Sequence, residues 1–433
     1  MPTHRQPGTV ITDHTFRVPL DHANPAGERI EVYAREVVAA RRDREPLPWL
    51  LFLQGGPGGR SPRPVGRDGW LNRALDDYRV LLLDQRGTGR STPVDRHTLP
   101  LRGDAAAQAR YLAHFRADSI VRDCELIRRE LLGEAGRWSL LGQSYGGFCT
   151  LTYLSYAPEG LREAFVTGGL PGLRSTPEAV YRAAYPRVQR KVEAHYARYP
   201  EDAETVRAVV RRLREQEVRL PGGGLLTAEA FQALGIMLGT GSGSHTLHYL
   251  LEDSLLPGHP FSDPFLAQVE SHLSFAGRPL YAVLHESIYG QRSASPHGTG
   301  WAAQSVRAEF PRFDADRALA EGAPVLLTGE MIYPWMFATD PALAPLAEAA
   351  ELLAQRADWP DLYEPDQLAR NDVPVAAAVY HDDMYVDTDD SLATARSVRR
   401  LRTWVTDEYE HDGLRISEGR VLDRLIRLVR GEL

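Results

Sequence analysis

Short, continuous apolar runs alternate with amphipathic stretches along the first part of the chain. Runs of four to eight apolar residues, bounded by turn formers, are typical of strands that are buried on both faces. Between the second and third runs, residues 119–132 show helical spacing of apolar positions. The alternation predicts a mostly parallel sheet covered by helices. The four runs are Pro48–Leu53, Tyr78–Leu83, Trp138–Leu141 and Ala164–Thr167.

The two ends of the chain add further strands to this predicted sheet. Residues 15–20 and 29–38 are extended-looking runs joined by a loop of turn formers, which predicts an antiparallel pair at a sheet edge. Near the C-terminus, strands are predicted at 374–380 and 402–406, and helices at about 391–400 and 417–429. The sheet therefore resumes after a long interruption.

The interruption has a different pattern. Apolar residues recur with helical spacing at 179–199, 204–217 and 227–238, and buried β-runs are scarce. We interpret this part as an inserted, mainly helical cap. The predicted division is an α/β core at 1–172, a helical cap at 173–372, and the rest of the core at 373–433.

Composition limits the possible functions. The chain has 433 residues, is 43% hydrophobic and 25% charged, and carries a net charge of -8, which argues against a nucleic-acid partner. No apolar run reaches the roughly 18 residues of a membrane span, and the polar N-terminus predicts no signal peptide. Cys124 and Cys149 have neither the number nor the spacing of a disulfide or zinc framework. We expect a cytoplasmic protein without a membrane partner.

The clearest chemical motif is Gly142-Gln143-Ser144-Tyr145-Gly146, a Gly-x-Ser-x-Gly pattern. It follows one apolar run and opens another, so it lies between a strand and a helix. In that context the motif predicts a nucleophile elbow, a tight turn that presents the serine at the carboxyl end of a strand. A plain glycine-rich turn is the alternative.

A serine nucleophile needs a base, and the base needs an orienting acid. On this type of sheet the order along the chain is serine, acid, histidine. After the pair Asp382-Asp383, which ends a predicted strand, His411 is the only histidine. We therefore predict His411 as the base and Asp383 as the acid, with Asp382 as the alternative acid. Asp387, Asp389 and Asp390 are interpreted as an acidic lead-in to the next helix.

Acyl transfer also needs N–H donors for the oxyanion of the tetrahedral intermediate. One donor is the backbone N–H of the residue after the nucleophile, here Tyr145. The other comes from a loop after an earlier strand, where glycine allows close backbone approach. Gly56, in Gly55-Gly56-Pro57-Gly58, is the predicted second donor. A flexible surface loop is the alternative.

Three segments together resemble the prolyl aminopeptidases (proline iminopeptidases): Gly55–Gly58, Asp84–Ser91 and Gly142–Gly147. The resemblance implies an α/β-hydrolase fold with a helical cap and a serine peptidase that releases an N-terminal residue, preferably proline. It implies a peptide substrate with a free N-terminus, and no metal or organic cofactor. There are two departures, because Gln54 stands where the family usually has histidine and Tyr145 where it often has tryptophan. The Asp84–Ser91 segment is expected to buttress the site without a catalytic role.

The resemblance further implies acidic cap residues that bind the free amine of the substrate. A buried ammonium group must be paired with a counter-charge. Glu286, in Leu284–Tyr289, is the first candidate and Glu330 the second. Aromatic side chains nearby could wall a proline-sized pocket or form cap core: Tyr289, Tyr333, Trp335 and Phe337. Tyr289 is the one that we carry forward as a substrate-binding candidate.

Two other functions compete with this one. An esterase or another amidase of the same fold would keep the triad and change the substrate. A non-catalytic, hydrolase-like binding protein would keep only the fold, and the ordered serine, aspartate and histidine count against it.

Overall fold

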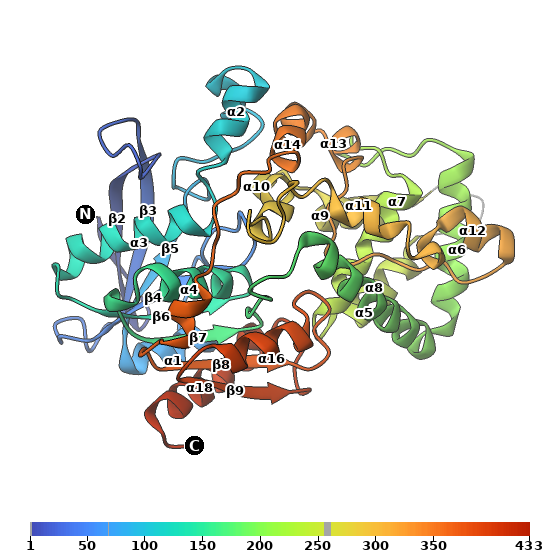
Figure 1. Cartoon of the computed structure of the whole chain (residues 1–433). Coiled ribbons are helices and arrows are strands. Elements are labelled where there is room, and N and C mark those ends of the chain that lie inside the picture. The colour runs from blue at the N-terminus through green and yellow to red at the C-terminus, as the bar shows by residue number, and fades with distance from the viewer. Residues whose placement is uncertain (1, 68, 255–260) are drawn as a thin grey trace.

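The computed structural model describes residues 2–67, 69–254 and 261–433. Its centre is a sheet whose nine described strands run in the order β1-β2-β3-β5-β4-β6-β7-β8-β9 (Figure 1). The strands are β1 (Thr3–Gln6), β2 (Thr9–Pro19), β3 (Arg29–Ala39), β4 (Trp49–Leu53), β5 (Arg79–Leu83), β6 (Trp138–Gln143), β7 (Leu161–Thr167), β8 (Val375–Tyr380) and β9 (Leu401–Thr406).

The sheet is antiparallel at one end and parallel elsewhere. β1, β2, β3 and β5 pair antiparallel, whereas β5, β4, β6, β7, β8 and β9 pair parallel. The predicted antiparallel pair is confirmed, but β1 lies outside it and was missed. Its residues are polar and largely exposed, so the strand has no hydrophobic pattern to reveal it. Parallel pairing brings the carboxyl ends of β4, β6, β7, β8 and β9 to one edge, where an α/β fold places its site.

The alternation of side chains along β4 explains the two layers of helices. Leu50 and Phe52 point to one face and pack with the helices α1 (Gly69–Asp77) and α18 (Arg420–Arg430). Leu51 and Leu53 point to the other face. That face is covered by α3 (Ala117–Leu132) and α4 (Tyr145–Tyr156). The central strands β4 to β8 are therefore buried on both faces, as their apolar runs predict.

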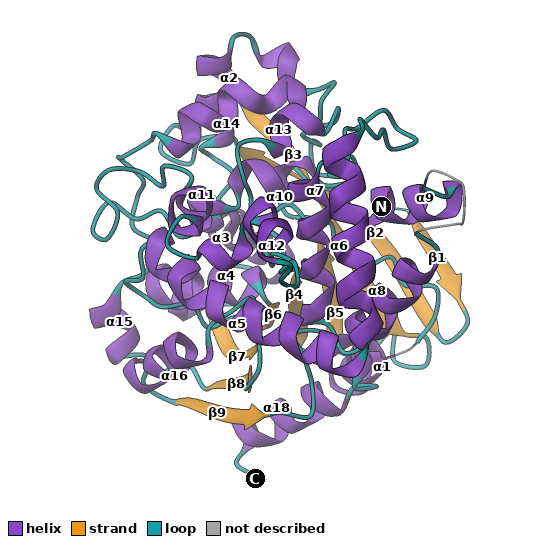
Figure 2. Cartoon of the chain, turned by 90° about the vertical axis from the view of Figure 1, so that its right-hand side faces the viewer, coloured by secondary structure: helices purple, strands orange, loops and turns teal. Residues whose placement is uncertain are grey.

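The described residues between β7 and β8 form helices and loops, with one isolated β-bridge between Arg219 and Leu225. They make a separate layer beside the sheet (Figure 1), and in the view turned by 90° several of these helices lie in front of the strands (Figure 2). These helices are α5 (Pro177–Arg198), α6 (Pro200–Glu215), α7 (Ala228–Gln232), α8 (Gly243–Glu252), α9 (Asp263–Leu273), α10 (Pro279–Leu284), α11 (Ala302–Arg307), α12 (Ala315–Glu321), α13 (Met336–Thr339), α14 (Ala347–Ala354) and α15 (Pro365–Ala369).

The remaining helices belong to the segments that carry the sheet. They are α2 (Ala105–Leu112), α16 (Thr388–Ser397) and α17 (Gly413–Ile416), with 3₁₀ turns η1 (Leu99–Arg102) and η2 (Pro158–Gly160). Between β7 and β8 the 3₁₀ turns are η3 (Ala233–Gly239), η4 (Glu286–Ile288), η5 (Pro311–Phe313) and η6 (Ala344–Leu346). Within the described residues, no helix is both long enough and apolar enough to cross a membrane.

Three predicted helices differ from the observed ones, and the one expected at about 391–400 is α16 at Thr388–Ser397. The helix expected at 227–238 is α-helical only in α7 and continues as η3. Gly235 approaches the carbonyl of Thr328 so closely that a β-carbon would lie 2.4 Å from its oxygen, so η3 follows the neighbouring segment. The last helix begins at Arg420 rather than Ser417, because Glu418 and Gly419 have positive φ angles (52° and 88°) that no α-helix contains.

Candidate active site

Ser144 lies in the turn between β6 and α4. Its backbone has φ 55° and ψ -123°, a strained conformation for a residue with a side chain. The glycines of the motif allow the turn to close: a β-carbon on Gly142 would lie 2.3 Å from the carbonyl oxygen of Gly146, and one on Gly146 would lie 1.9 Å from that of Leu53. The structure thus gives Ser144 the backbone geometry of a nucleophile elbow.

Asp383 and His411 come together from the ends of neighbouring strands. Asp383 follows β8 and His411 follows β9, and Nδ1 of His411 lies 2.6 Å from Oδ2 of Asp383. The other carboxylate oxygen of Asp383 accepts the backbone N–H groups of Tyr385 (2.8 Å) and Val386 (3.1 Å). Both side chains are buried. The carboxyl group of Asp383 is therefore fixed by two backbone N–H groups, with its other oxygen aimed at the imidazole.

Asp382, the alternative acid, lies elsewhere. Its side chain is 62% exposed and pairs with His381 at 3.0 Å. Adjacent residues at a strand end point in opposite directions, so only one of the two aspartates can face the imidazole. The geometry favours Asp383.

Three neighbours hold the imidazole of His411. The ring of Tyr385 meets it edge-on, with centroids 4.8 Å apart, and the backbone N–H of His411 donates to the carbonyl of Gly239 in η3 (3.2 Å). Gly168 follows β7 with φ 51°, and a β-carbon there would lie 3.0 Å from Nδ1 of the ring. Burial lowers the pKa of His411, but the charge and hydrogen bond of Asp383, aided by Glu330, outweigh it and raise the pKa.

The loop after β4 lies against the nucleophile. A β-carbon on Gly55 would be 2.9 Å from Cβ of Ser144, so the backbone of this loop approaches the serine closely. Tyr145 is the first residue of α4, and the N–H groups at a helix N-terminus have no partner within the helix. Gly56 and Ser144 line the same cavity. The predicted oxyanion donors are thus placed on two backbone segments that meet beside Ser144.

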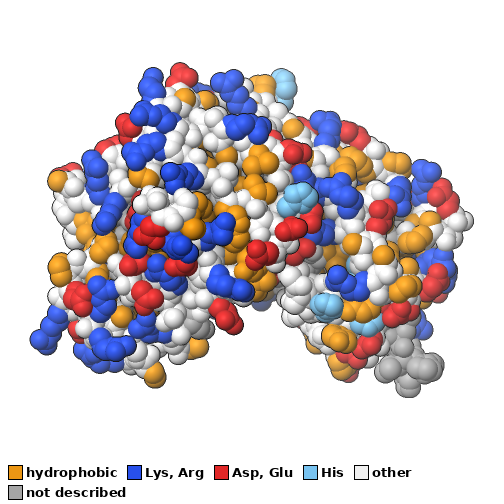
Figure 3. All heavy atoms as spheres, turned by 90° about the horizontal axis from the view of Figure 1, so that it is seen from below, with side chains coloured by type: hydrophobic (Ala, Val, Ile, Leu, Met, Phe, Trp, Pro, Cys, Tyr) orange, Lys and Arg blue, Asp and Glu red, His pale blue; other side chains and the backbone are white. Residues whose placement is uncertain are grey.

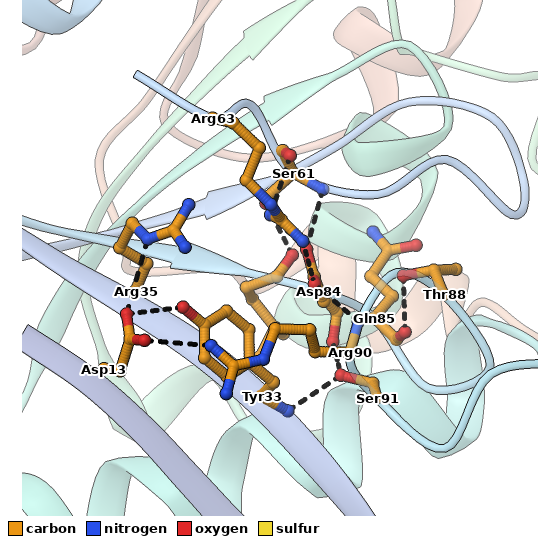
Figure 4. A network of polar contacts seen from close by, with 11 residues as sticks. Asp13, Tyr33, Arg35, Ser61, Arg63, Asp84, Gln85, Thr88, Arg90 and Ser91 are labelled. Carbon is orange, nitrogen blue, oxygen red and sulfur yellow. Dashed lines mark hydrogen bonds and ion pairs between the residues drawn. The ribbon is translucent and has the colours of Figure 1, made fainter. Parts of the chain in front are cut away.

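Asp84 and Gln85, which follow β5, contact residues on both sides of the Gly55–Gly59 loop, and the contacts of Asp84 with Ser61 and Arg63 are seen in Figure 4. The side-chain amide of Gln85 donates to the carbonyl of Gln54 (3.0 Å). Asp84, which is fully buried, accepts the backbone N–H of Ser61 (3.1 Å) and pairs with Arg63. These contacts agree with the buttressing expected of the Asp84–Ser91 segment.

A cavity of about 470 Å³ lies between the sheet and the helical layer. The molecule seen from below has two lobes with a notch between them (Figure 3). Residues from both layers line the cavity. From the sheet side they include Gly55, Gly56, Ser144, Tyr385, His411 and Arg415; from the helical side they include Ile236, Met237, Thr246, His272, Arg278, Tyr281 and Glu330.

Glu330 brings a carboxylate into this cavity. Glu330 lies in a segment without helix or strand, and Gln232 of α7 holds this segment by two hydrogen bonds. The side-chain amide of Gln232 donates to the carbonyl of Leu326 (2.7 Å), and the backbone carbonyl of Gln232 accepts the N–H of Thr328 (2.8 Å). The hydroxyl of Tyr281 in α10 donates to Glu330. The structure therefore places the carboxyl group of Glu330, held by Tyr281, in the same cavity as Ser144 and His411.

Glu286 and Tyr289 lie deeper and are not among the residues that line the cavity. Glu286 is 5% exposed; its Oε1 accepts the N–H of Ala303 (2.9 Å), and its Oε2 has no hydrogen-bond partner among the described residues. Burial raises the pKa of Glu286 to about 7, against the opposing effect of backbone N–H groups from α11. The ring of Tyr289 packs on Phe148 and His285. Of the other aromatic candidates, Trp335 lines a neighbouring apolar cavity.

Sequence reasoning missed Tyr281, Tyr385 and Gly168. Tyr385 could have been predicted from the sequence as a residue of the site, because it lies two residues after the predicted acid. Gly168 begins a Gly-Gly pair at the end of β7, which is the kind of signal that marks a close approach. Tyr281 carried none, because its role depends on how α10 packs against the segment of Glu330.

Comparisons with known proteins agree with this architecture. The family model described as "alpha/beta hydrolase fold" matches residues 48–414. An α/β fold with a serine elbow and a histidine–aspartate pair at the strand ends defines an α/β-hydrolase of the serine type.

Comparison with individual relatives identifies the family within the α/β-hydrolases. A proline iminopeptidase from Aeromonas sobria is 49% identical over 96% of both chains, and one from Aspergillus aculeatus is 37% identical over 98% of this chain and 95% of its own. A solved esterase from Thermogutta terrifontis aligns over 96% of this chain and 99% of its own, with 15% identity and a TM-score of 0.43. The chain belongs to the proline iminopeptidase family of α/β-hydrolases.

Proposed function

We propose that this protein is a serine aminopeptidase that removes an N-terminal residue, preferably proline, from peptides. One observation carries the proposal beyond the family: the cavity that contains Ser144 and His411 also contains the carboxylate of Glu330. A free N-terminal amine is a cation, and a cation that gives up part of its hydration on entering a cavity needs a counter-charge there. An esterase for uncharged substrates has no use for this charge.

The chemistry runs through an acyl-enzyme. The hydroxyl of Ser144 attacks the carbonyl carbon of the first residue while Nε2 of His411 takes its proton. Asp383, bonded to Nδ1 at 2.6 Å, stabilises the imidazolium that forms. The backbone N–H groups of Gly56 and Tyr145 bind the oxyanion. His411 then gives its proton to the leaving amine, and a water molecule, activated by the same imidazole, releases the free amino acid and restores the serine.

In this proposal, residues on the helical side of the cavity bind the N-terminal amine of the substrate. Glu330 is the direct partner of the ammonium group, because it lines the cavity and Tyr281 holds it in place. Glu286 contributes to amine binding indirectly, because it lies behind the cavity wall, where its Oε2 has no hydrogen-bond partner among the described residues. Tyr289 packs in that wall and supports the pocket through Phe148 and His285. The proposal divides the chain into a catalytic core (1–172 and 373–433) and a recognition cap (173–372).

The same proposal covers the substrate, the cofactor requirement and the cellular compartment. The enzyme works on peptides with a free N-terminus and needs no cofactor for the steps above. We place it in the cytoplasm, which agrees with two buried cysteines that form no disulfide.

The discriminating experiment compares prolyl, alanyl and N-acetylprolyl 2-naphthylamides on the purified protein, with Ser144→Ala as the blank. We expect kcat/KM to fall in that order and the blank to be inactive. Loss of the ammonium leaves Glu330 unpaired, so the N-acetyl substrate should be at least about 100-fold worse. Equal turnover of the N-acetyl and free substrates would contradict the proposal, as would an uncharged ester that is turned over much faster than any of the three.

A further inference from the structure

Two arginines line the catalytic cavity, and the mechanism proposed above uses neither of them. They are Arg278, the residue before α10, and Arg415, in α17. Both residues are exposed, and neither forms an ion pair with a carboxylate in the part of the chain that the structure describes. A guanidinium group that is free of protein carboxylates beside a substrate cavity is a suitable partner for an anionic group of the substrate.

Arg278 lies on the side of the cavity where the substrate amine is expected. Its guanidinium lies over the ring of Tyr281, 4.8 Å from the centroid. The hydroxyl of the same tyrosine donates to Glu330. Arg278 therefore belongs to the part of the cavity that faces the N-terminus of the substrate.

Arg415 lies on the sheet side of the cavity, beside the reacting groups. Its guanidinium is 3.4 Å from Oε1 of Gln143, the residue before the nucleophile. A β-carbon on Gly55 would lie 2.8 Å from that same oxygen and 2.9 Å from Cβ of Ser144. Burial and the charge of Arg415 both act to lower the pKa of His411, so this charge is also close to the imidazole. Arg415 is thus near the serine, the oxyanion loop and the base.

The carboxylate of a dipeptide bound at Ser144 would come close to this guanidinium. Three bonds separate the scissile carbonyl carbon of a dipeptide from its carboxylate carbon, so the two atoms are at most about 4 Å apart. A charge-assisted hydrogen bond spans about 2.8 Å more. The space beside Arg415 is also open, because Gln54, Gln143 and Arg415 line a second cavity of about 390 Å³ as well as the catalytic one. The residue that leaves therefore has room on this side of Ser144.

We propose that Arg415 binds the C-terminal carboxylate of a dipeptide substrate while Glu330 binds the amine at the other end. Given the aminopeptidase function proposed above, on which this inference rests, the preferred substrates are dipeptides with both ends free. A planar guanidinium suits the task, because it can hold both oxygens of one carboxylate. Since Arg415 is exposed, water weakens the pair, and we expect it to contribute about 5-fold to kcat/KM.

The test compares two substrates that differ only in this carboxylate. Release of free proline from Pro-Gly and from Pro-Gly amide gives kcat/KM for each, and the ratio of the two values is the readout. The ratio should fall by about 5-fold in Arg415→Met, and Arg415→Lys should keep part of it. A purely structural role of Arg415 would slow both substrates equally and leave the ratio unchanged, which would overturn the proposal.

An acidic side chain on the leaving residue offers the same chemistry from another position. Pro-Asp amide and Pro-Asn amide form the second pair of substrates, and the loss in Arg415→Met should be larger for the Pro-Gly pair than for this one. If only the ratio of Pro-Asp amide to Pro-Asn amide falls, Arg415 binds side-chain carboxylates, and the assignment to the C-terminus is wrong.

Two further variants make the result specific. Arg420→Met is the matched control, because Arg420 is an exposed arginine of the next helix and is not among the residues that line the cavity; its ratio should equal that of the wild type. A ratio that falls in Arg278→Met but not in Arg415→Met would overturn the assignment to Arg415.

The outcome also separates this inference from the function on which it rests. If the wild type releases proline from Pro-Gly amide and the ratio is the same in Arg415→Met, the aminopeptidase function stands and the role of Arg415 is refuted. If the wild type releases proline from none of the four substrates, both are refuted.

Discussion

The sheet side of the catalytic cavity and its helical side are built in different ways. On the sheet side, the triad residues and Gly56 lie in the turn or loop that follows a strand: Gly56 after β4, Ser144 after β6, Asp383 after β8 and His411 after β9. Parallel pairing of these strands sets where the groups meet. On the helical side, Glu330 lies in a segment without regular structure, and Glu286 lies in a single 3₁₀ turn.

The two sides of the cavity differ in what positions their functional groups. Backbone hydrogen bonds of a sheet place the reacting groups, and a change there misplaces the chemistry. Side-chain contacts such as Tyr281 to Glu330 and Gln232 to Leu326 place the recognition groups. We therefore expect substitutions on the sheet side to lower kcat and those on the helical side to raise KM.

The largest effect should come from Asp383→Asn. An amide cannot stabilise the imidazolium and favours the wrong tautomer of His411, so kcat should fall by about 10⁴-fold, as in other triads. Steady-state kinetics with prolyl 2-naphthylamide measures it. Asp382→Asn is the matched control, because its side chain is 62% exposed, and it should stay within about twofold of wild type. Reversed effects would make Asp382 the triad acid.

Glu286→Gln should change how stability depends on pH. The folded-state pKa of about 7 exceeds the ordinary value of 4.5, so the folded protein holds a proton that the unfolded chain releases. The free energy of unfolding then falls as the pH rises from about 4.5 to above 7, by up to about 3 kcal/mol, or roughly 200- to 300-fold in the equilibrium constant.

The glutamine variant should not lose this stability between pH 5 and pH 8, which urea unfolding at several pH values would measure. Glu348→Gln, an exposed change in the same layer, should keep the wild-type dependence. A Glu286→Gln curve parallel to that of the wild type would show that Glu286 titrates normally.

Glu330→Gln should raise KM for free-amine substrates and lower kcat/KM by about 30-fold, because a charge-assisted hydrogen bond to the ammonium is lost. An ester without an amine serves as the control substrate on the same variant. It should be turned over at the wild-type rate or faster. A fall in kcat alone, equal for both substrates, would assign Glu330 to the chemistry and weaken the contrast between the two sides.

The smallest effect should come from Gly168→Ala, at about 10-fold in kcat/KM. The added methyl would lie 3.0 Å from Nδ1 of His411 and would displace the ring. Gly133→Ala is the control for backbone strain, because Gly133 has φ 76° and ψ 172°, a conformation that only glycine adopts readily, but has nothing within 4 Å of the added methyl. It should lose stability without losing activity, and equal activity losses in both variants would show that strain, not the imidazole, is responsible.

The contrast also explains what the sequence could predict. His411 and Asp383 could be selected from the sequence alone, because strand ends and chain order constrain them. Tyr281 could not be, since its contact with Glu330 depends on the packing of α10. The extent of α7 was wrong because Gly235 meets the carbonyl of Thr328, a contact between segments about 90 residues apart in the sequence. β1 was missed because polar residues on an edge strand show no pattern.

Two hydrogen bonds join the sheet side of the cavity to its helical side. The backbone N–H of His411 donates to Gly239, and the hydroxyl of Tyr385 donates to the carbonyl of Ile236, both in η3. The 3₁₀ turn η3 on the helical side is thus hydrogen-bonded to the loops that carry Asp383 and His411. A substrate that displaced η3 would therefore also displace His411 and Tyr385.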